Sequence, residues 1–171
     1  MKLITILFFV IGSFITPSVS ADPVIVVNKA SHELAVFKGG KEIFHAPVAT
    51  GKTKELTPEG VFTIKVKAVN PYYRKKNIPG GDPKNPLGSR WIGFDANGTD
   101  GRIFGVHGTN RPGSIGKSVS AGCIRMKKEN VEKLYDLVSV GDKIIITNQQ
   151  KSLEEIYNEW EKKELHSMIT H

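Results

Sequence analysis

The stretch HGTNRPGSIGKSVSAGCIRM, His107 to Met126, contains Cys123, which is the only cysteine of the 171-residue chain. A thiol near neutral pH is mostly protonated, so catalysis by a cysteine needs a neighbouring base, and histidine is the usual one. Of the five histidines, only His107 lies at the end of an apolar run and immediately before a glycine-rich turn. The stretch therefore predicts a nucleophile and its base, with a structural thiol and a backbone-bonded histidine as the alternative.

A single cysteine cannot form an internal disulfide, although exported domains that use cysteine structurally usually hold it in pairs. Composition alone leaves three roles open for this thiol: a small buried hydrophobe, a partner in an intermolecular disulfide, or a reactive group. One cysteine and scattered histidines give no recognised zinc-ligand spacing. We therefore expect no metal and no other cofactor.

The N-terminus has the layout of a secretory signal, with Lys2, an apolar run over Leu3–Ile15, and small residues up to Ala21. The apolar run is too short for a spanning helix, which needs about 20 apolar residues. We expect cleavage after Ala21 and no stable membrane insertion afterwards; a retained anchor is the alternative. The expected organisation is a signal peptide at 1–21, one domain at 22–149 and a C-terminal helical extension at 150–171.

The chain carries a net charge of +7, from 24 basic and 17 acidic residues. Removal of the predicted signal takes away Lys2 and no acidic residue, which leaves 23 − 17 = +6. A basic exported protein suits an anionic surface such as a cell wall. The basic residues are scattered and no nucleic-acid-binding motif accompanies them, so we expect no nucleic-acid partner.

Between the signal and the C-terminal extension the sequence predicts short β-strands separated by Gly, Pro and Asn. The Gly39-Gly40 pair suits the positive φ angles of a type I′ hairpin. The expected strands are Val24–Asn28, His32–Lys38, Lys41–Thr50, Val61–Ala68, Arg90–Asp95, Arg102–His107 and Lys143–Thr147. In the fourth of them, alternation predicts one apolar face made of Phe62, Ile64, Val66 and Ala68.

Two segments predict helices. Between Glu129 and Ser139 apolar residues recur at i, i+3, i+4 and i+7, and Gly141 follows as a stop. The second helix begins at Ser152, with Glu155 placed to complete a capping box. We expect its apolar stripe to dock on the domain, with a partner protein as the alternative. The stripe consists of Leu153, Ile156, Tyr157 and Trp160.

Residues 70–89 contain four prolines and three glycines and predict a loop of about twenty residues. Such a long loop inside a compact domain is often a lid or a binding loop. It carries an aromatic and cationic set suited to a carboxylated or sugar-bearing ligand, with a merely solvated loop as the alternative. The set is Tyr72, Tyr73, Arg74, Lys75 and Lys76.

The residues around Cys123 suit acyl transfer. Gly122 lets the backbone approach closely, so that successive N–H groups can stabilise an oxyanion. Ser120 offers a hydroxyl donor, unless it is only a turn residue. Arg125 lies on the same side of an extended segment as Cys123 and would clamp a substrate carboxylate, unless it is only a surface charge.

Together these motifs resemble the L,D-transpeptidase (YkuD-type) catalytic domain, over about Val24 to Thr147. The residues that carry the resemblance are His107-Gly108-Thr109, then Ser120-x-Gly122-Cys123-Ile124-Arg125-Met126, with Thr57–Phe62 for the T-P-x-G-x-F segment and Asn85–Gly88 with Arg90-Trp91 for the stretch before the catalytic strand. The resemblance implies a mainly β fold, a β-sandwich of mixed sheets with one packed helix, to which this chain adds a C-terminal helix.

The resemblance also implies an exported cysteine L,D-transpeptidase of the cell wall that acts on peptidoglycan stem peptides. Cys123 would attack the third stem residue, typically meso-diaminopimelate, and expel D-alanine. His107 would be the base, oriented by the Gly108 carbonyl, and the N–H groups of Gly122 and Cys123 would form the oxyanion hole. The implied substrate-binding residues are Arg125, Ser120, Thr109, Tyr73 and Trp91.

A second stem amine would then give a 3→3 cross-link, whereas water would make the enzyme an L,D-carboxypeptidase. The resemblance further suggests carbapenems as inhibitors. Many members have a second histidine directly before Gly-Cys, where this chain has Ala121. Other members lack that histidine as well, so activity is still expected.

Three other classes of protein share part of this pattern. Sortases share the order His, Cys, Arg, but their cysteine follows a Thr-Leu-x-Thr pattern and their histidine lies much further upstream. Papain-type proteases place the cysteine before the histidine. A non-catalytic peptidoglycan-binding module with the same fold is favoured only by Ala121, and the intact pair of His107 and Cys123 argues against it.

Overall fold

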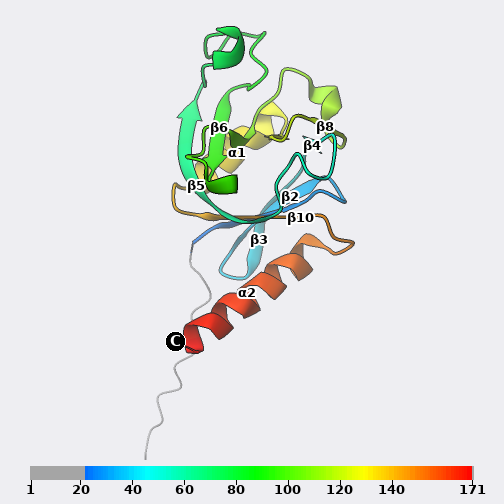
Figure 1. Ribbon diagram of the computed structural model, residues 1–171, viewed down its shortest axis with the longest axis vertical. Coiled ribbons are helices and arrows are strands. Elements are labelled where there is room, and N and C mark those ends of the chain that lie inside the picture. Colours follow the sequence, from blue (N-terminus) through cyan, green and yellow to red (C-terminus); the bar gives the residue numbers. More distant parts are fainter. Residues whose placement is uncertain (1–21, 171) are drawn as a thin grey trace, which may run out of the picture.

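The computed structural model describes residues 22–170, so the predicted signal peptide at 1–21 lies outside the described residues. Strands dominate, and two α-helices pack against them (Figure 1). The strands are β1 (Val24–Asn28), β2 (Glu33–Lys38), β3 (Lys41–Pro47), β4 (Thr50–Gly51), β5 (Gly60–Val69), β6 (Arg90–Phe94), β7 (Phe104–His107), β8 (Ser118–Ser120), β9 (Ile124–Arg125) and β10 (Lys143–Thr147). The helices are α1 (Lys128–Leu137) and α2 (Leu153–Ile169), with three 3-10 turns, η1 (Arg74–Lys76), η2 (Ala96–Gly98) and η3 (Pro112–Ser114).

Eight strands form one mixed sheet in the order β3-β2-β1-β10-β5-β6-β7-β9, and β4 and β8 form a two-stranded ribbon. Neighbours in the large sheet are antiparallel except β1 with β10 and β7 with β9. The sheet curls about β5, and its inner face and α1 enclose the main core (Figure 1). The expected sandwich of mixed sheets is therefore confirmed, with its layers formed by the two halves of one continuous sheet.

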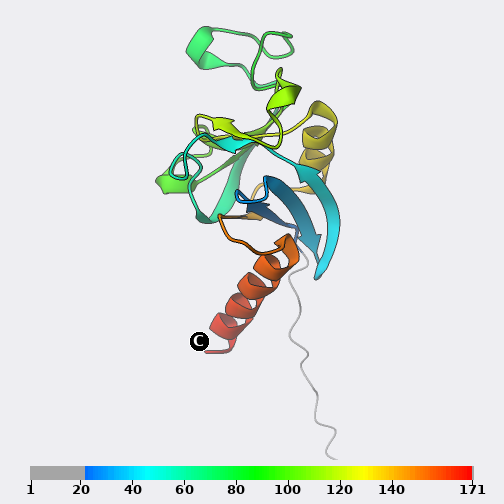
Figure 2. The ribbon, with the colours of Figure 1, turned by 90° about the vertical axis from the view of Figure 1, so that its right-hand side faces the viewer.

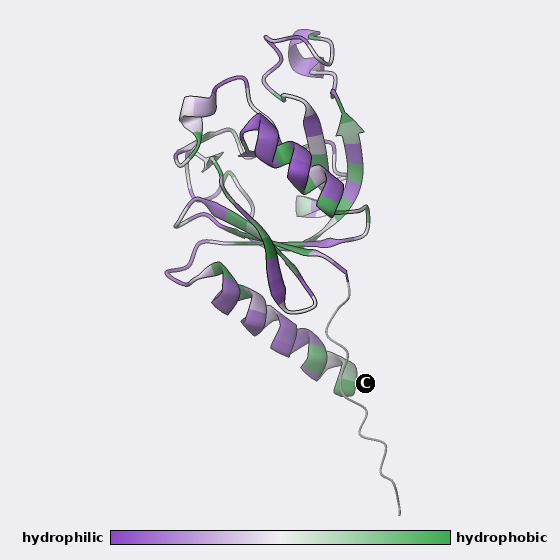
Figure 3. Ribbon diagram, turned by 180° about the vertical axis from the view of Figure 1, so that it is seen from behind, coloured by the Kyte–Doolittle hydropathy of each residue, from purple (hydrophilic) through white to green (hydrophobic). Residues whose placement is uncertain are grey.

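The strands β1, β2 and β10 are buried on both faces, which explains the continuous apolar run of β1. Ile25 and Val27 point into the main core beneath α1, whereas Val24 and Val26 point to the opposite face. That opposite face is covered by α2, so the two helices lie on opposite sides of the sheet (Figure 3).

The predicted capping box at the start of α2 is confirmed. The Ser152 hydroxyl accepts a hydrogen bond from the Glu155 N–H at 3.1 Å, and the Glu155 carboxylate accepts one from the Ser152 N–H at 2.8 Å. The predicted docking is also confirmed, because the Tyr157 ring stacks on Phe37 of β2 with a centroid separation of 4.5 Å. Leu153, Ile156 and Tyr157 are buried in the same cluster, and Trp160 packs against it.

The prediction of one apolar face along β5 is wrong beyond Ile64. A bulge at Lys65 shifts the register with β6, so that Ile64 pairs with Phe94 but Ala68 pairs with Trp91. One inserted residue exchanges the faces of everything after it. Lys67 therefore lies on the inner side, where its ammonium donates to two carbonyls at the end of α1, those of Tyr135 and Val138.

Val66 and Ala68 lie on the outer side of the sheet. There they line a pocket together with Trp91. Bulges often occur next to functional sites, because they re-aim side chains.

The remaining differences are at element ends. The predicted Lys41–Thr50 strand stops at Pro47, after which Ala49 pairs with Arg125 and Thr50 with Ser118. Gly39 and Gly40 have φ of 57° and 77°, as the predicted type I′ hairpin requires.

Within residues 22–170, no helix combines the length and the apolar character needed to cross a bilayer.

Replacement of Tyr157 by Ala should lower the free energy of unfolding by about 3–5 kcal/mol, because it removes a buried ring that stacks on Phe37. Urea denaturation of the two proteins measures the difference. Met168→Ala on the same helix is the control, since Met168 is 66% exposed and its loss should change stability by less than about 0.5 kcal/mol. If Tyr157→Ala changes the free energy of unfolding as little as Met168→Ala does, then α2 contributes little to stability through this face.

Candidate active site

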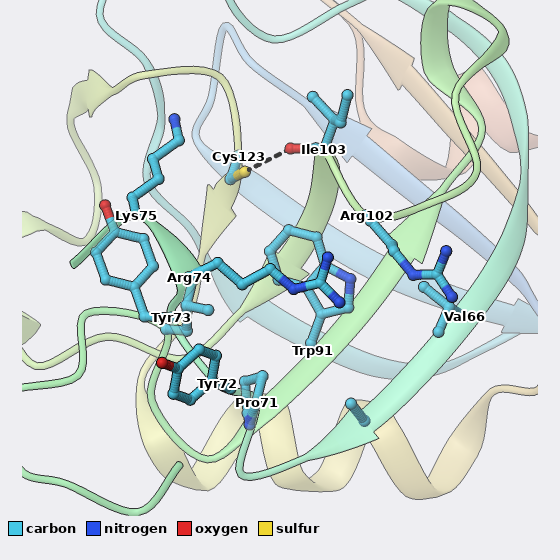
Figure 4. A pocket seen from close by; sticks show the side chains of 12 residues that line it. Val66, Pro71, Tyr72, Tyr73, Arg74, Lys75, Trp91, Arg102, Ile103 and Cys123 are labelled. Carbon is cyan, nitrogen blue, oxygen red and sulfur yellow. Dashed lines mark hydrogen bonds between the residues drawn. The ribbon is translucent and has the colours of Figure 1, made fainter. Parts of the chain in front are cut away.

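A pocket of about 470 Å³ opens on the outer face of β5 and β6, beside Cys123 (Figure 4). Its rim comes from the long loop at 70–89, which extends from the end of the molecule opposite α2 (Figure 2). The lining residues are Val66, Ala68, Pro71, Tyr72, Tyr73, Arg74, Lys75, Leu87, Trp91, Arg102, Ile103 and Cys123. The expected binding loop therefore does border the predicted nucleophile.

Trp91 forms one wall of the pocket and is held by its indole N–H, which donates to the Gly101 carbonyl at 2.9 Å. The indole lies where side chains at two neighbouring positions would stand. A Cβ at Gly105 would approach the ring to 2.7 Å, and one at Gly93 would approach the indole nitrogen to 2.5 Å. The absence of side chains at Gly93 and Gly105 makes room for Trp91. Because the Trp91 N–H is occupied by the Gly101 carbonyl, it is not available to a substrate.

His107 ends β7 and is 4% exposed, with its ring stacked on Trp91 at a centroid separation of 5.6 Å. Its Nδ1 lies 2.6 Å from the Gly108 carbonyl oxygen. Since a carbonyl can only accept, Nδ1 carries the proton and Nε2 keeps its lone pair. The predicted orientation of the imidazole by Gly108 agrees with this contact.

Burial lowers the pKa of His107 from 6.5 to about 4. The Gly108 carbonyl opposes this shift, the charge of Arg125 adds to it, and the Leu87 carbonyl opposes it again. The imidazole is therefore neutral at neutral pH, which is the form that a general base requires.

Two backbones pass unusually close beside His107. A Cβ at Gly88 would lie 2.8 Å from the Gly108 Cα, and Gly88 has φ of 65°. The two glycines together let the Gly88 and Gly108 backbones pass each other next to the residue that carries the imidazole. This contact gives a physical reason for glycine at both positions.

Cys123 is brought to His107 by the parallel pairing of β7 with β9, which sets Val106 beside Ile124 and His107 beside Arg125. Val106 and Ile124 are buried in the main core. Alternate residues point to opposite faces, so His107, Cys123 and Arg125 all point to the outer face. The sixteen-residue separation in sequence is thereby closed.

The Cys123 thiol is half-buried and donates to the Ile103 carbonyl, with Sγ and O 3.4 Å apart (Figure 4). Burial raises the pKa of this thiol; the Gly105 backbone N–H and the charges of Lys75 and Arg125 oppose the rise. The resting site therefore holds a protonated thiol and a neutral imidazole on one face of the sheet.

The turn before Cys123 differs from the expectation for Ser120 and Gly122. The Gly122 N–H donates to the Ser120 hydroxyl at 3.0 Å, and that hydroxyl donates to the Cys123 carbonyl at 2.6 Å. The Gly122 N–H is thus engaged and does not point at an oxyanion. Ser120 is 1% exposed, so it holds the turn and is not placed to bind a substrate.

Thr57 is a site residue whose role the sequence did not reveal. Its buried hydroxyl accepts from the Gly51 N–H at 2.8 Å and donates to the Gly122 carbonyl at 3.0 Å. Gly122 has φ of 132°, and a Cβ there would lie 2.5 Å from the Leu56 carbonyl oxygen. The T-P-x-G-x-F segment therefore supports the turn that presents the cysteine.

The other predicted substrate-binding residues are only partly brought together. Tyr73 and Trp91 line the pocket, and Arg125 lies beside His107 in the β7–β9 register without lining the pocket. The Thr109 hydroxyl accepts from the Arg111 N–H at 3.0 Å and lies outside the pocket lining. Ala121 is exposed at the turn. Across residues 22–170, no group of three or more His, Cys, Asp or Glu side chains is arranged to hold a metal ion.

Comparison with known proteins gives a consistent result. The family model of the L,D-transpeptidase catalytic domain, YkuD, matches residues 22–146. A protein of Bacillus subtilis (strain 168), YqjB, whose name proposes L,D-transpeptidase activity, is 59% identical over 135 residues, which cover 79% of this chain and 77% of that protein.

Longer relatives match over part of their length. ErfK/SrfK of Escherichia coli (strain K12), whose name proposes the same activity, is 32% identical over 73% of this chain and 44% of its own. The solved L,D-transpeptidase from Mycobacterium smegmatis superposes with a TM-score of 0.55 at 30% identity, over 74% of this chain and 58% of that one. This chain thus spans about half the length of these two relatives.

The buried imidazole predicts a dependence of stability on pH. The pKa of His107 is about 4 in the folded protein and about 6.5 in the unfolded one, so the unfolded state binds a proton first as the pH falls. About 3 kcal/mol of stability should be lost between pH 6.5 and pH 4 through this residue. Urea denaturation of the wild type and His107→Asn should show a shallower decline for the variant; parallel declines would contradict the assignment.

Thr57→Val should reduce the free energy of unfolding by about 1–3 kcal/mol, because it leaves the Gly51 N–H and the Gly122 carbonyl unpaired in a buried place. It should also slow the reaction of Cys123 with iodoacetamide or with substrate, since the turn loses its support. Thr53→Val, at an exposed position of the same loop, is the matched control. If both variants behave like the wild type, the role given to Thr57 is wrong.

Proposed function

The chain belongs to the L,D-transpeptidase (YkuD) catalytic-domain family, a family of enzymes, and from that premise we propose that it is an exported cysteine L,D-transpeptidase acting on peptidoglycan tetrapeptide stems. The observation that carries the proposal is the common face of His107 and Cys123. A neutral imidazole whose Nδ1 is bonded to the Gly108 carbonyl lies on that face, and the thiol opens into a pocket of about 470 Å³.

Acylation begins when His107 takes the proton of the Cys123 thiol. The sulfur attacks the carbonyl carbon of the third stem residue, so that a C–S bond forms and the carbonyl electrons move to oxygen. Collapse of this intermediate breaks the C–N bond to the terminal D-alanine. The leaving amine takes the proton from the His107 imidazolium, which leaves a thioester and restores the neutral base.

The oxyanion of this intermediate needs a donor, and we assign the Cys123 N–H to it. Among the hydrogen bonds of residues 22–170, none occupies this N–H, whereas the Gly122 N–H is bound to Ser120. The Ser120 hydroxyl and the Thr57 hydroxyl fix the two carbonyls on either side of the Cys123 N–H. A donor held in place before the reaction costs no reorganisation during it.

The thioester is then resolved by a nucleophile that gives up a proton to His107. The side-chain amine of a second stem would form an amide and complete a 3→3 cross-link. Water in its place would release a tripeptide stem, which is the L,D-carboxypeptidase reaction. A wall-binding module without activity would have no need of the hydroxyl and glycine contacts that hold His107 and Cys123.

Two sequence features support the proposed place of action. The signal-like N-terminus favours export, and the predicted charge of +6 after signal removal favours an anionic wall. We therefore propose that the enzyme acts outside the cytoplasm, in contact with the cell wall. A carbapenem presents a strained carbonyl to the same thiol, so we propose that this class acylates Cys123.

Incubation of the protein spanning residues 22–171 with disaccharide-tetrapeptide tests the proposal by mass spectrometry. The wild type should release D-alanine, form a covalent adduct at Cys123 and yield dimers. Cys123→Ala should abolish all three while its circular dichroism stays unchanged. Product formation by that variant would refute the nucleophile.

Two further readouts separate the remaining possibilities. Tripeptide without dimer would assign the carboxypeptidase reaction. Binding to isolated wall without any adduct or product would assign the non-catalytic module.

A further inference from the structure

Within the described part of the chain, the pocket beside Cys123 is lined by three cations and no acidic side chain. Arg74 and Lys75 come from η1, and Arg102 precedes β7. Arg102 is paired with Asp100 at 2.7 Å, whereas none of the ion pairs found within residues 22–170 involves Arg74 or Lys75. Arg74 and Lys75 therefore present positive charge to the pocket, and no ion pair of the described residues balances it.

Of these three cations, Lys75 is the one that acts on the nucleophile, since its charge opposes the rise in the pKa of the Cys123 thiol. Figure 4 shows Lys75 and Cys123 on the same side of the pocket, with Arg102 on the other side near Val66. Arg125 also acts on the thiol, but it does not line the pocket. Lys75 is thus the cation that a bound ligand meets next to the thiol.

The backbone that carries Lys75 is held in place. Tyr73 and Ile78 bridge the base of η1, with N–H to O distances of 2.9 Å and 3.2 Å, and Asn77 adopts a left-handed conformation with φ of 54° between them. The buried Asn85 amide donates to the carbonyls of Pro71 at 2.9 Å and Pro79 at 3.1 Å. The tip of the long loop is therefore a built structure that holds Lys75 at the pocket rim.

We propose that Lys75 recognises the terminal carboxylate of the acyl donor and so restricts the enzyme to the last residue of a peptide stem. This inference rests on the proposed function. In a donor whose scissile carbonyl meets Cys123, the carboxylate of the leaving residue lies one residue further along, where consecutive Cα atoms are about 3.8 Å apart. An ammonium group at the rim beside the thiol is within reach of that carboxylate.

A charge-assisted hydrogen bond of this kind should favour a free carboxylate over a neutral amide by about 10- to 100-fold. Lys76 is the natural control, because it is the next residue of η1, carries the same charge and does not line the pocket. Lys75→Arg keeps the charge and serves as the conservative replacement.

The first test needs no peptidoglycan substrate. Iodoacetate and iodoacetamide both alkylate Cys123, with formation of a C–S bond and loss of iodide, but only iodoacetate carries a carboxylate. Lys75→Met should lower the ratio of the iodoacetate rate to the iodoacetamide rate about fivefold at low salt. Lys76→Met and Lys75→Arg should leave the ratio close to that of the wild type. An unchanged ratio in Lys75→Met, or an equal fall in Lys76→Met, would overturn the proposal.

The second test uses tetrapeptide donors that end in D-alanine or in D-alaninamide. Lys75→Met should lower kcat/KM for the free acid about 10- to 100-fold, mainly through KM, and leave the amide within about twofold. Equal losses for both donors would overturn carboxylate recognition. If the wild type processes neither donor, the proposed function fails, and the alkylation ratio still decides whether Lys75 selects carboxylates at this thiol.

Discussion

The parallel pairing of β7 with β9 is the contact on which the whole site depends. β9 has two residues, Ile124 and Arg125, and its register sets Ile124 beside Val106 in the core. Because side chains alternate, the residues on either side of Ile124 must point outward with His107. A slip of one residue would turn Cys123 into the core and bring Ile124 out to the pocket. The reactive geometry is therefore a consequence of one buried apolar pair.

A two-residue strand cannot hold such a register alone, and three further contacts to the backbone fix it. Ala49 and Arg125 exchange two backbone hydrogen bonds of 2.9 Å, and the Met126 N–H donates to the His107 carbonyl at 2.9 Å. The Thr57 hydroxyl donates to the Gly122 carbonyl at 3.0 Å. The Thr57 loop is anchored in turn by the buried ammonium of Lys29, which donates to the Thr57 carbonyl and pairs with Glu59, both at 2.9 Å.

The sequence predicts the elements whose signals are local. The Gly39-Gly40 hairpin, the Ser152 capping box and the apolar runs of β1 and β10 depend on residues close in the chain, and the structure confirms them. The role of a glycine such as Gly105 depends instead on Trp91 lying across it from a neighbouring strand. Strands as short as β4 and β9 carry no periodicity of their own.

The prediction that the Gly122 N–H helps to form an oxyanion hole also depended on a contact that is made only in the folded chain. Gly122 does permit a close backbone approach, but the hydroxyl of Ser120, two residues earlier, competes for its N–H. Short polar side chains commonly bond to nearby backbone groups, and only the folded turn decides whether they do. The bulge at Lys65 is a comparable case, because a perfect alternation in sequence says nothing about an unpaired residue in the ladder.

Burial determines the charge state of the pair that this register brings together. It lowers the pKa of His107 to about 4 and raises that of Cys123, so the resting pair is a neutral thiol and a neutral imidazole. Thiols are far less readily oxidised than thiolates, which suits the proposed place of action outside the cytoplasm. The charge of Arg125 favours the thiolate and disfavours the imidazolium at once. In the proposed reaction, an imidazolium at His107 would therefore hold its proton weakly and pass it readily to the leaving amine.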